Sequence, residues 1–134
     1  MPTDLTALSA TPLYAGLAAL LYLALSVHVI RVRIRQRVMQ GDGGDKVMMK
    51  AMRTHANCGE YMPISLILLL VVELQGAPLW AVHTLGIMFI AGRVLHAVGF
   101  GRHPQIIPMR QGGMILTFVM LLLSGLGLVA HTLL

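Results

Sequence analysis

The sequence has few charged residues, few acidic residues and almost no cysteine. Only 11% of its 134 residues are charged and 57% are hydrophobic, whereas a soluble domain carries about 25% charged residues. Because Cys58 is the single cysteine, the chain cannot form an internal disulfide framework. We expect Cys58 to be a small packing residue. A net charge of +5 is also found in proteins that bind nucleic acids, but the high hydropathy makes membrane topology the better explanation, so we expect no nucleic-acid partner. The composition indicates an integral membrane protein with one domain, residues 1–134.

The apolar residues form four long segments, each close to the ~20 residues that cross a bilayer as a helix. We therefore predict an all-α integral membrane protein, a bundle of four transmembrane helices at about residues 12–37, 47–74, 78–99 and 111–134. A polar, glycine-rich loop follows the first segment, and a tight turn from Gln75 to Pro78 joins the second to the third. We expect a third connection without regular helix, because it contains the helix breakers Gly99, Gly101, Pro104 and Pro108.

The ten basic residues predict the orientation of these helices. All of them lie in or beside the first and third connections: Arg31, Arg33, Arg35, Arg37, Lys46, Lys50, Arg53, Arg93, Arg102 and Arg110. Because loops rich in lysine and arginine stay in the cytoplasm, we expect both basic loops there and both termini outside. Asp4 and Glu73 then fall on the outer side.

The second segment carries a stripe of polar residues. Arg53, Asn57, Glu60 and Tyr61 stand at i, i+4, i+7 and i+8, so they share one face of a helix. A carboxylate in hydrocarbon costs roughly 2.5–3.5 kcal/mol and needs partners. Two interpretations stay open, a structural ion pair between helices and a functional site.

A second polar group lies at the cytoplasmic end of the third segment. Arg93, His96 and Phe100 stand at i, i+3 and i+7 and share a face. We expect Arg93 to pair with Glu60 rather than to extend to the membrane surface. His55, His96 and Glu60 are possible metal ligands, but no pair has the tight spacing of a zinc site, and we expect no metal.

The predicted pocket is rich in arginine and has apolar helices around it. Arginines bind carboxylates with two hydrogen bonds, and a glutamate binds an ammonium group. An arginine near a thiol lowers its pKa and favours the nucleophilic thiolate. Glutathione offers all of these groups, namely two carboxylates, one amine and one thiol. The pocket therefore suits glutathione, presented to a lipophilic partner.

Two motifs resemble a known family. Arg53-x-His55-x-Asn57-Cys58-x-Glu60-Tyr61-x-Pro63 resembles the second-helix signature of the MAPEG family, the membrane-associated proteins in eicosanoid and glutathione metabolism. Gly92-Arg93-Val94-x-His96, followed by Pro108-Met109-Arg110, is similar to the third helix and following loop of the family's prostaglandin synthase. Other segments look like a bacterial inner-membrane branch. The resemblance covers nearly the whole chain and implies a multi-pass protein of the cell inner membrane.

The resemblance also implies an assembly and a set of site residues. The assembly is a homotrimer that binds glutathione between neighbouring subunits. The implied catalytic residues are Arg110, which would stabilise the thiolate, and Arg33 at the end of the first helix; Arg102 is a poorer match than Arg110. The implied glutathione-binding residues are Arg31, Arg33, Arg53, His55, Asn57, Glu60, Tyr61, Arg93, His96 and Phe100. Phe100 stands where eukaryotic members carry a tyrosine, so one hydroxyl contact is missing.

We interpret the chain as a glutathione transferase or peroxidase that acts on lipophilic electrophiles, with glutathione as co-substrate and no metal. Membrane lipids, the electrophile and the other subunits are its expected partners. Two alternatives stay open. One is a non-catalytic glutathione-binding or structural membrane protein, which Phe100 favours. The other is a small four-helix transporter, although such exporters carry their membrane glutamate centrally in the first helix, and here it is in the second.

Overall fold

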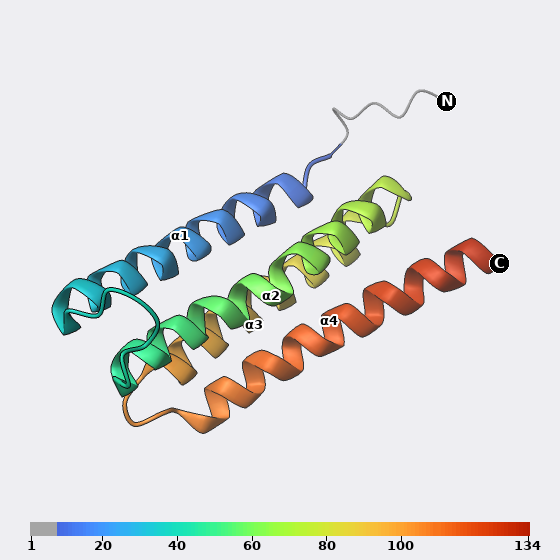
Figure 1. Ribbon diagram of the computed structural model, residues 1–134. Coiled ribbons are helices and arrows are strands. Elements are labelled where there is room, and N and C mark those ends of the chain that lie inside the picture. The colour runs from blue at the N-terminus through green and yellow to red at the C-terminus, as the bar shows by residue number, and fades with distance from the viewer. Residues whose placement is uncertain (1–7) are drawn as a thin grey trace.

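The computed structural model describes residues 8–134, which form four helices (Figure 1). They are α1 (Thr11–Gln36), α2 (Lys46–Leu74), α3 (Leu79–Gly101) and α4 (Ile107–Leu133). Each helix is long and apolar enough to cross a membrane. Successive helices run in opposite directions, so the first and third connections lie at the same end of the molecule. The predicted all-α fold with four transmembrane helices is confirmed.

The third connection is shorter than the sequence suggested. Helix α3 continues through Gly99 to Gly101, and α4 begins at Ile107 rather than at residue 111. The expectation that Pro108 interrupts the helix was wrong, because this proline lies in the first turn of α4, where a backbone N–H has no partner within the helix. Gly99 is buried against Met109 and Arg110, so it brings the end of α3 onto the start of α4.

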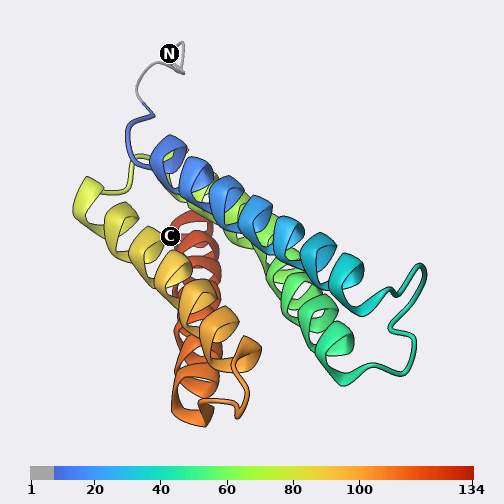
Figure 2. The same cartoon turned by 90° about the vertical axis from the view of Figure 1, so that its left-hand side faces the viewer.

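The four helices pack most closely as two pairs, which also contact each other (Figure 2). Helix α3 packs along α4, and α1 packs along α2. Helix α2 also contacts α3 and α4, whereas α1 and α4 make no contact within the described residues. Hydrocarbon provides no hydrophobic force between helices, so close packing at small residues matters most. At Gly92 of α3, an added Cβ would lie 2.9 Å from the carbonyl oxygen of Gly113 of α4.

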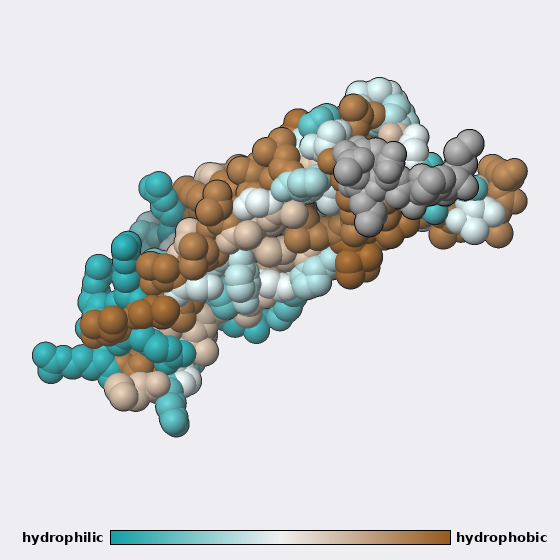
Figure 3. Space-filling view, turned by 90° about the horizontal axis from the view of Figure 1, so that it is seen from above, coloured by the Kyte–Doolittle hydropathy of each residue, from teal (hydrophilic) through white to brown (hydrophobic). Residues whose placement is uncertain are grey.

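The basic residues gather at one end of the molecule. Figure 3 shows hydrophilic side chains concentrated at this end and hydrophobic ones along the body. The loop between α1 and α2 is ordered by its own acids, since Asp45 accepts a 2.7 Å hydrogen bond from the Met48 N–H and caps α2. The Lys50 ammonium donates to the carbonyl oxygen of Arg102, at 2.7 Å, and ties α2 to the end of α3. Both basic connections therefore belong to one polar end.

A buried glutamate fixes the opposite end. Glu73, near the end of α2, accepts hydrogen bonds from the backbone N–H groups of Ser9, Ala10 and Thr11, at 2.8, 2.9 and 2.7 Å. These N–H groups at the start of α1 have no partner within the helix, and the helix dipole favours a negative charge there. Glu73 is thus a long-range cap that joins α2 to α1. Asp4, which the sequence analysis also assigned to this side, lies outside the described residues.

Candidate functional site

Arg93 is the centre of the polar cluster inside the helices. Its side chain is only 1% exposed and is the largest of the fully buried side chains. The guanidinium donates from Nε and Nη2 to the Thr117 hydroxyl oxygen, at 3.0 and 2.7 Å, and from Nη1 to the Asn57 side-chain oxygen, at 2.8 Å. A further contact of 3.3 Å joins Nη2 to the Met114 sulfur. Arg93 therefore connects α2, α3 and α4 through one side chain.

The contact between α3 and α4 explains why Arg93 points inward. Gly92 and Gly113 allow the two backbones to approach closely, which places Thr117 beside the arginine. The Thr117 hydroxyl donates its own hydrogen to the Gly113 carbonyl oxygen, at 2.9 Å. Its oxygen is then oriented to accept both bonds from Arg93, so the threonine holds the guanidinium plane in one direction.

The predicted pairing of Arg93 with Glu60 was wrong. Arg93 pairs with the neutral Asn57 and lies 5.0 Å from the centre of the Tyr61 ring, a cation–π arrangement. Glu60 is exposed on the outside of α2. The reason is helix geometry: Asn57 and Glu60 share a stripe, but only its Asn57 and Tyr61 edge turns toward α3, while Glu60 and Arg53 stay on the outer edge.

The predicted residues of α1 and the α2 entrance form a separate group. Arg33 donates to the carbonyl oxygens of Val38 and Gly41, at 3.3 and 2.9 Å, so it braces the loop after α1. Arg31 is exposed. His55 faces α1, where its Nε2 lies 3.0 Å from the Ser26 hydroxyl and its ring lies 4.6 Å from the Tyr22 ring.

The predicted residues at the α3–α4 connection form a third group. The ring of His96 stacks on that of Phe100, with 5.8 Å between centroids. The Arg110 guanidinium lies 4.9 Å from the centre of the Phe100 ring and donates to the Gln105 side-chain oxygen, at 2.9 Å. Arg110 is exposed, as is Arg102. A single chain therefore brings Arg93, Asn57 and Tyr61 together, but across the described residues it leaves Arg33 and Arg110 on helices that do not touch.

Thr117 is the residue of this cluster that the sequence analysis missed. Its position, one turn after Gly113 on α4, gives a small-residue spacing that is typical of close helix contacts. That spacing was a signal for a buried hydroxyl facing α3. Met114 carries no comparable signal, because methionine is an ordinary residue of a membrane helix.

The comparisons with known proteins decide the family. The model of the MAPEG family matches residues 11–130, which include all but the last turn of the four helices. The chain belongs to the MAPEG family. It is also 44% identical over 111 residues to the inner membrane protein YecN of Escherichia coli strain K12, with 83% of each chain covered. The protein of the same name from Escherichia coli O6:H1 is similar to the same extent.

The family and these relatives support a multi-pass protein of the inner membrane. The resemblance found in the sequence motifs is thereby confirmed. The name "inner membrane protein YecN" gives a location and no reaction. The roles of the individual site residues therefore stay predictions.

Proposed function

We propose that this MAPEG protein is a glutathione-dependent transferase or peroxidase that acts on lipophilic electrophiles at the cytoplasmic face of the inner membrane. The family includes glutathione transferases. The observation that carries the proposal is the exposed pair Arg53 and Glu60, which flanks the fixed polar edge of Asn57 and Tyr61 on one membrane helix. In the proposal Arg53 binds a carboxylate of glutathione, and Glu60 binds its ammonium group.

The depth of Glu60 explains why it needs a partner. It lies 14 residues before the end of α2 at Leu74, so it is about 21 Å from that end at 1.5 Å per residue. That places it inside the ~30 Å hydrocarbon layer when the apolar outer half of α2 spans the membrane. In the described part of a single subunit, Glu60 makes no hydrogen bond or ion pair. A neighbouring subunit and a bound ammonium group together would supply the partners that a carboxylate requires at this depth.

The separation of Arg33 and Arg110 supports a homotrimer with shared sites. Within one subunit these arginines belong to α1 and α4, which make no contact across the described residues. Assembly of subunits around α2 can bring α1 of one subunit to α4 of the next. A site between subunits would then receive the α2 stripe, a first-helix arginine and Arg110.

In the proposed mechanism each residue binds or stabilises a different group of glutathione. Arg53 and a first-helix arginine bind the glutathione carboxylates, Glu60 binds the ammonium, and Asn57 donates from its amide nitrogen, because its oxygen is occupied by Arg93. Arg110 stabilises the thiolate, which attacks the electrophile from the lipid side. The carbon–sulfur bond forms as the leaving group departs with its electron pair, and the thiol proton goes to water.

A non-catalytic glutathione-binding protein is the second candidate. Phe100 favours it, because the ring carries no hydroxyl and lies under the Arg110 guanidinium. Glutathione titration of the purified protein, followed by the ultraviolet absorbance of the thiolate, tests both candidates. Binding with thiolate formation and turnover of a chlorodinitrobenzene acceptor supports the transferase. Binding of the protonated thiol without turnover supports the second candidate, and absence of binding contradicts both.

A further inference from the structure

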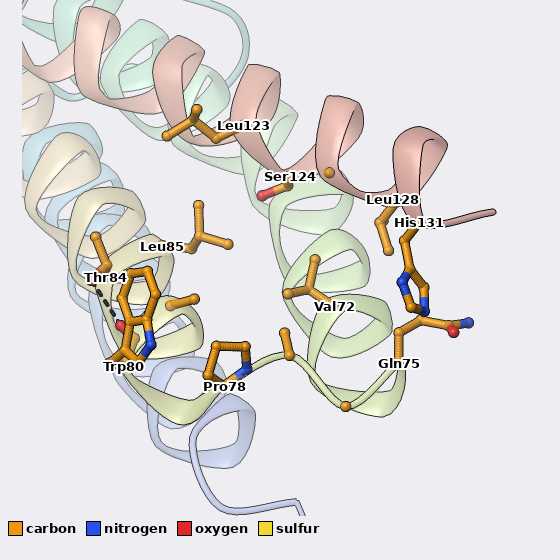
Figure 4. Close-up of a pocket in the computed structure, with 14 residues that line it drawn as sticks. Val72, Gln75, Pro78, Trp80, Thr84, Leu85, Leu123, Ser124, Leu128 and His131 are labelled. Carbon is orange, nitrogen blue, oxygen red and sulfur yellow. Dashed lines mark hydrogen bonds between the residues drawn. The ribbon is translucent and has the colours of Figure 1, made fainter. Parts of the chain in front are cut away.

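A separate cavity of about 530 Å³ lies at the end of the molecule opposite the basic loops. It is bounded by the turn between α2 and α3, the first turns of α3 and the last turns of α4, as Figure 4 shows. Small-molecule sites have volumes of about 300–1,000 Å³ and are mostly apolar with few polar groups. This cavity fits that description: Val72, Leu85, Leu123 and Leu128 line it, and among residues 8–134 no Lys, Arg, Asp or Glu does. It therefore suits a neutral, lipophilic occupant.

Ser124 is the polar group that distinguishes this cavity from an ordinary gap between helices. It is 1% exposed, and its hydroxyl oxygen has no hydrogen-bond partner in the part of the chain that the structure describes. Figure 4 shows this hydroxyl directed from α4 into the space beside Leu85 and Val72. A buried hydroxyl without a partner costs about 1–3 kcal/mol in a folded protein.

Six other helical hydroxyls make a hydrogen bond that Ser124 lacks. A serine or threonine in a helix commonly donates to the carbonyl oxygen four residues earlier. Six side chains do so here, at 2.7–2.9 Å: Ser26, Thr54, Ser65, Thr84, Thr117 and Thr132. The Ser124 hydroxyl has no such bond to Met120, although that residue is in regular helix. Its hydrogen is thus available to a group inside the cavity.

The remaining polar groups of the lining narrow the class of ligand. The Thr84 hydroxyl is already bonded to the Trp80 carbonyl oxygen, at 2.7 Å (the dashed line in Figure 4). Gln75 and His131 lie near the rim of the cavity, at the ends of α2 and α4. Ser124 is seven residues deeper than His131, or about 10 Å along the helix. A ligand would therefore place one acceptor oxygen well below the rim, on an otherwise apolar skeleton.

We propose that this cavity binds a neutral lipophilic molecule from the bilayer through an acceptor oxygen, a ketone or ether oxygen, that receives the Ser124 hydroxyl. The site lies about two helical turns from Thr117 along α4 and shares no lining residue with the arginine cluster. It is a second ligand site, independent of whether glutathione binds.

Trp80 makes the proposal measurable. It is the single tryptophan of the chain and lines the cavity. The test uses two probes of equal chain length, a brominated long-chain ketone and the matching brominated alkane, with the protein in nanodiscs. Bromine quenches tryptophan fluorescence on contact. Because Trp80 is 72% exposed, both probes dissolved in the lipid will quench it gradually, so the informative signal is a saturable component near one probe per subunit.

The expected result depends on two variants and one matched control. The ketone should give the saturable component, and Ser124→Ala should weaken its apparent affinity about five- to tenfold, the value of one neutral hydrogen bond, while quenching by the alkane is unchanged. Gly127→Leu should remove the saturable component, because Gly127 lines the cavity and open space surrounds the position of its Cβ. Gly125→Leu is the control: it also has open space but does not line the cavity.

Three results would overturn the proposal. One is equal quenching by the ketone in wild type and in Gly127→Leu, which would mean that the cavity is not occupied. Another is an unchanged ketone affinity in Ser124→Ala, which would mean that the hydroxyl does not bind the ligand. The third is a change of oligomeric state in Gly127→Leu but not in Gly125→Leu, since the cavity would then be covered by a second copy of the chain.

Discussion

Arg93 and Thr117 are joined by two hydrogen bonds that end on one hydroxyl oxygen, at 3.0 and 2.7 Å. The threonine takes the place that the sequence analysis gave to a carboxylate. A neutral partner holds the guanidinium in position and leaves its positive charge in place, which a carboxylate would cancel. The charge then faces the Tyr61 ring. This pair is accordingly a structural support for the polar cluster rather than a salt bridge.

Thr117→Val removes the hydroxyl and keeps the shape of the side chain. The variant should lose about 1.5–3 kcal/mol of stability, because hydrogen bonds to a charged buried group are worth that much. Thr117→Ser should keep most of it. Thermal unfolding in detergent measures the difference. If Val and Ser variants unfold at the same temperature as the wild type, Arg93 has another partner in the membrane.

Glu73→Gln tests the cap on α1. The amide keeps the size of the side chain but removes the charge and one acceptor, so the first turn of α1 should open more often, at a cost of about 0.5–2 kcal/mol. Hydrogen exchange at the amides of Ser9, Ala10 and Thr11 should accelerate, since these donate to Glu73. Asp42→Asn is the control, because Asp42 lies in the α1–α2 loop at the other end of the molecule, where its carboxylate accepts from the Gly44 N–H. Equal exchange in both variants would contradict the cap.

Hydropathy and charge predicted the four helices and the common end of the two basic loops, because both depend on composition within a segment. Helix periodicity also predicted that Asn57 and Tyr61 share a face with Glu60. It did not predict which edge of that face turns toward α3. That choice depends on contacts between segments, here those of Arg93 on α3 with Asn57 and Tyr61 on α2. For the same reason Glu73 was interpreted only as an outer charge, since its three donors precede it by more than 60 residues.

The orientation of the chain in the membrane is the third prediction. Both termini should face outside and both basic loops the cytoplasm, because the lysines and arginines cluster in those loops. The test fuses a reporter after Leu134 that is active only in the cytoplasm, and a second that is active only outside. Activity of the outside reporter alone is expected. Activity of the cytoplasmic reporter alone would show that the orientation is the opposite one, with the basic loops outside.

Glu60→Gln also tests the partner that the carboxylate requires. If Glu60 binds the glutathione ammonium and a neighbouring subunit, the variant should weaken glutathione affinity or trimer stability by about 3–5 kcal/mol, because a buried cation loses its partner. Calorimetric titration and chemical cross-linking separate the two effects. Asp42→Asn, in the exposed loop, is the control. If affinity and assembly are both unchanged, Glu60 faces water and takes no part in the site.

Arg110 is the residue on which the proposed chemistry depends. A thiol with a pKa of about 8.5 is mostly protonated at neutral pH, and a close guanidinium lowers a neighbouring pKa by roughly 1–3 units. Arg110→Ala should therefore reduce turnover strongly and glutathione affinity less, because the carboxylates remain bound by Arg53 and a first-helix arginine. Arg110→Lys should keep part of the rate, since it keeps the charge but loses the planar fork.

Arg102→Ala is the matched comparison for Arg110→Ala. Both side chains are exposed near the α3–α4 connection, but Arg110 lies over the Phe100 ring beside the cluster, whereas Arg102 follows the end of α3. Steady-state rates with a chlorodinitrobenzene acceptor across pH should show a large loss for Arg110→Ala and a small one for Arg102→Ala. A larger loss of rate for Arg102→Ala than for Arg110→Ala would indicate that Arg102 contacts the thiolate. Full activity in both variants would exclude activation of the thiol by an arginine of this connection.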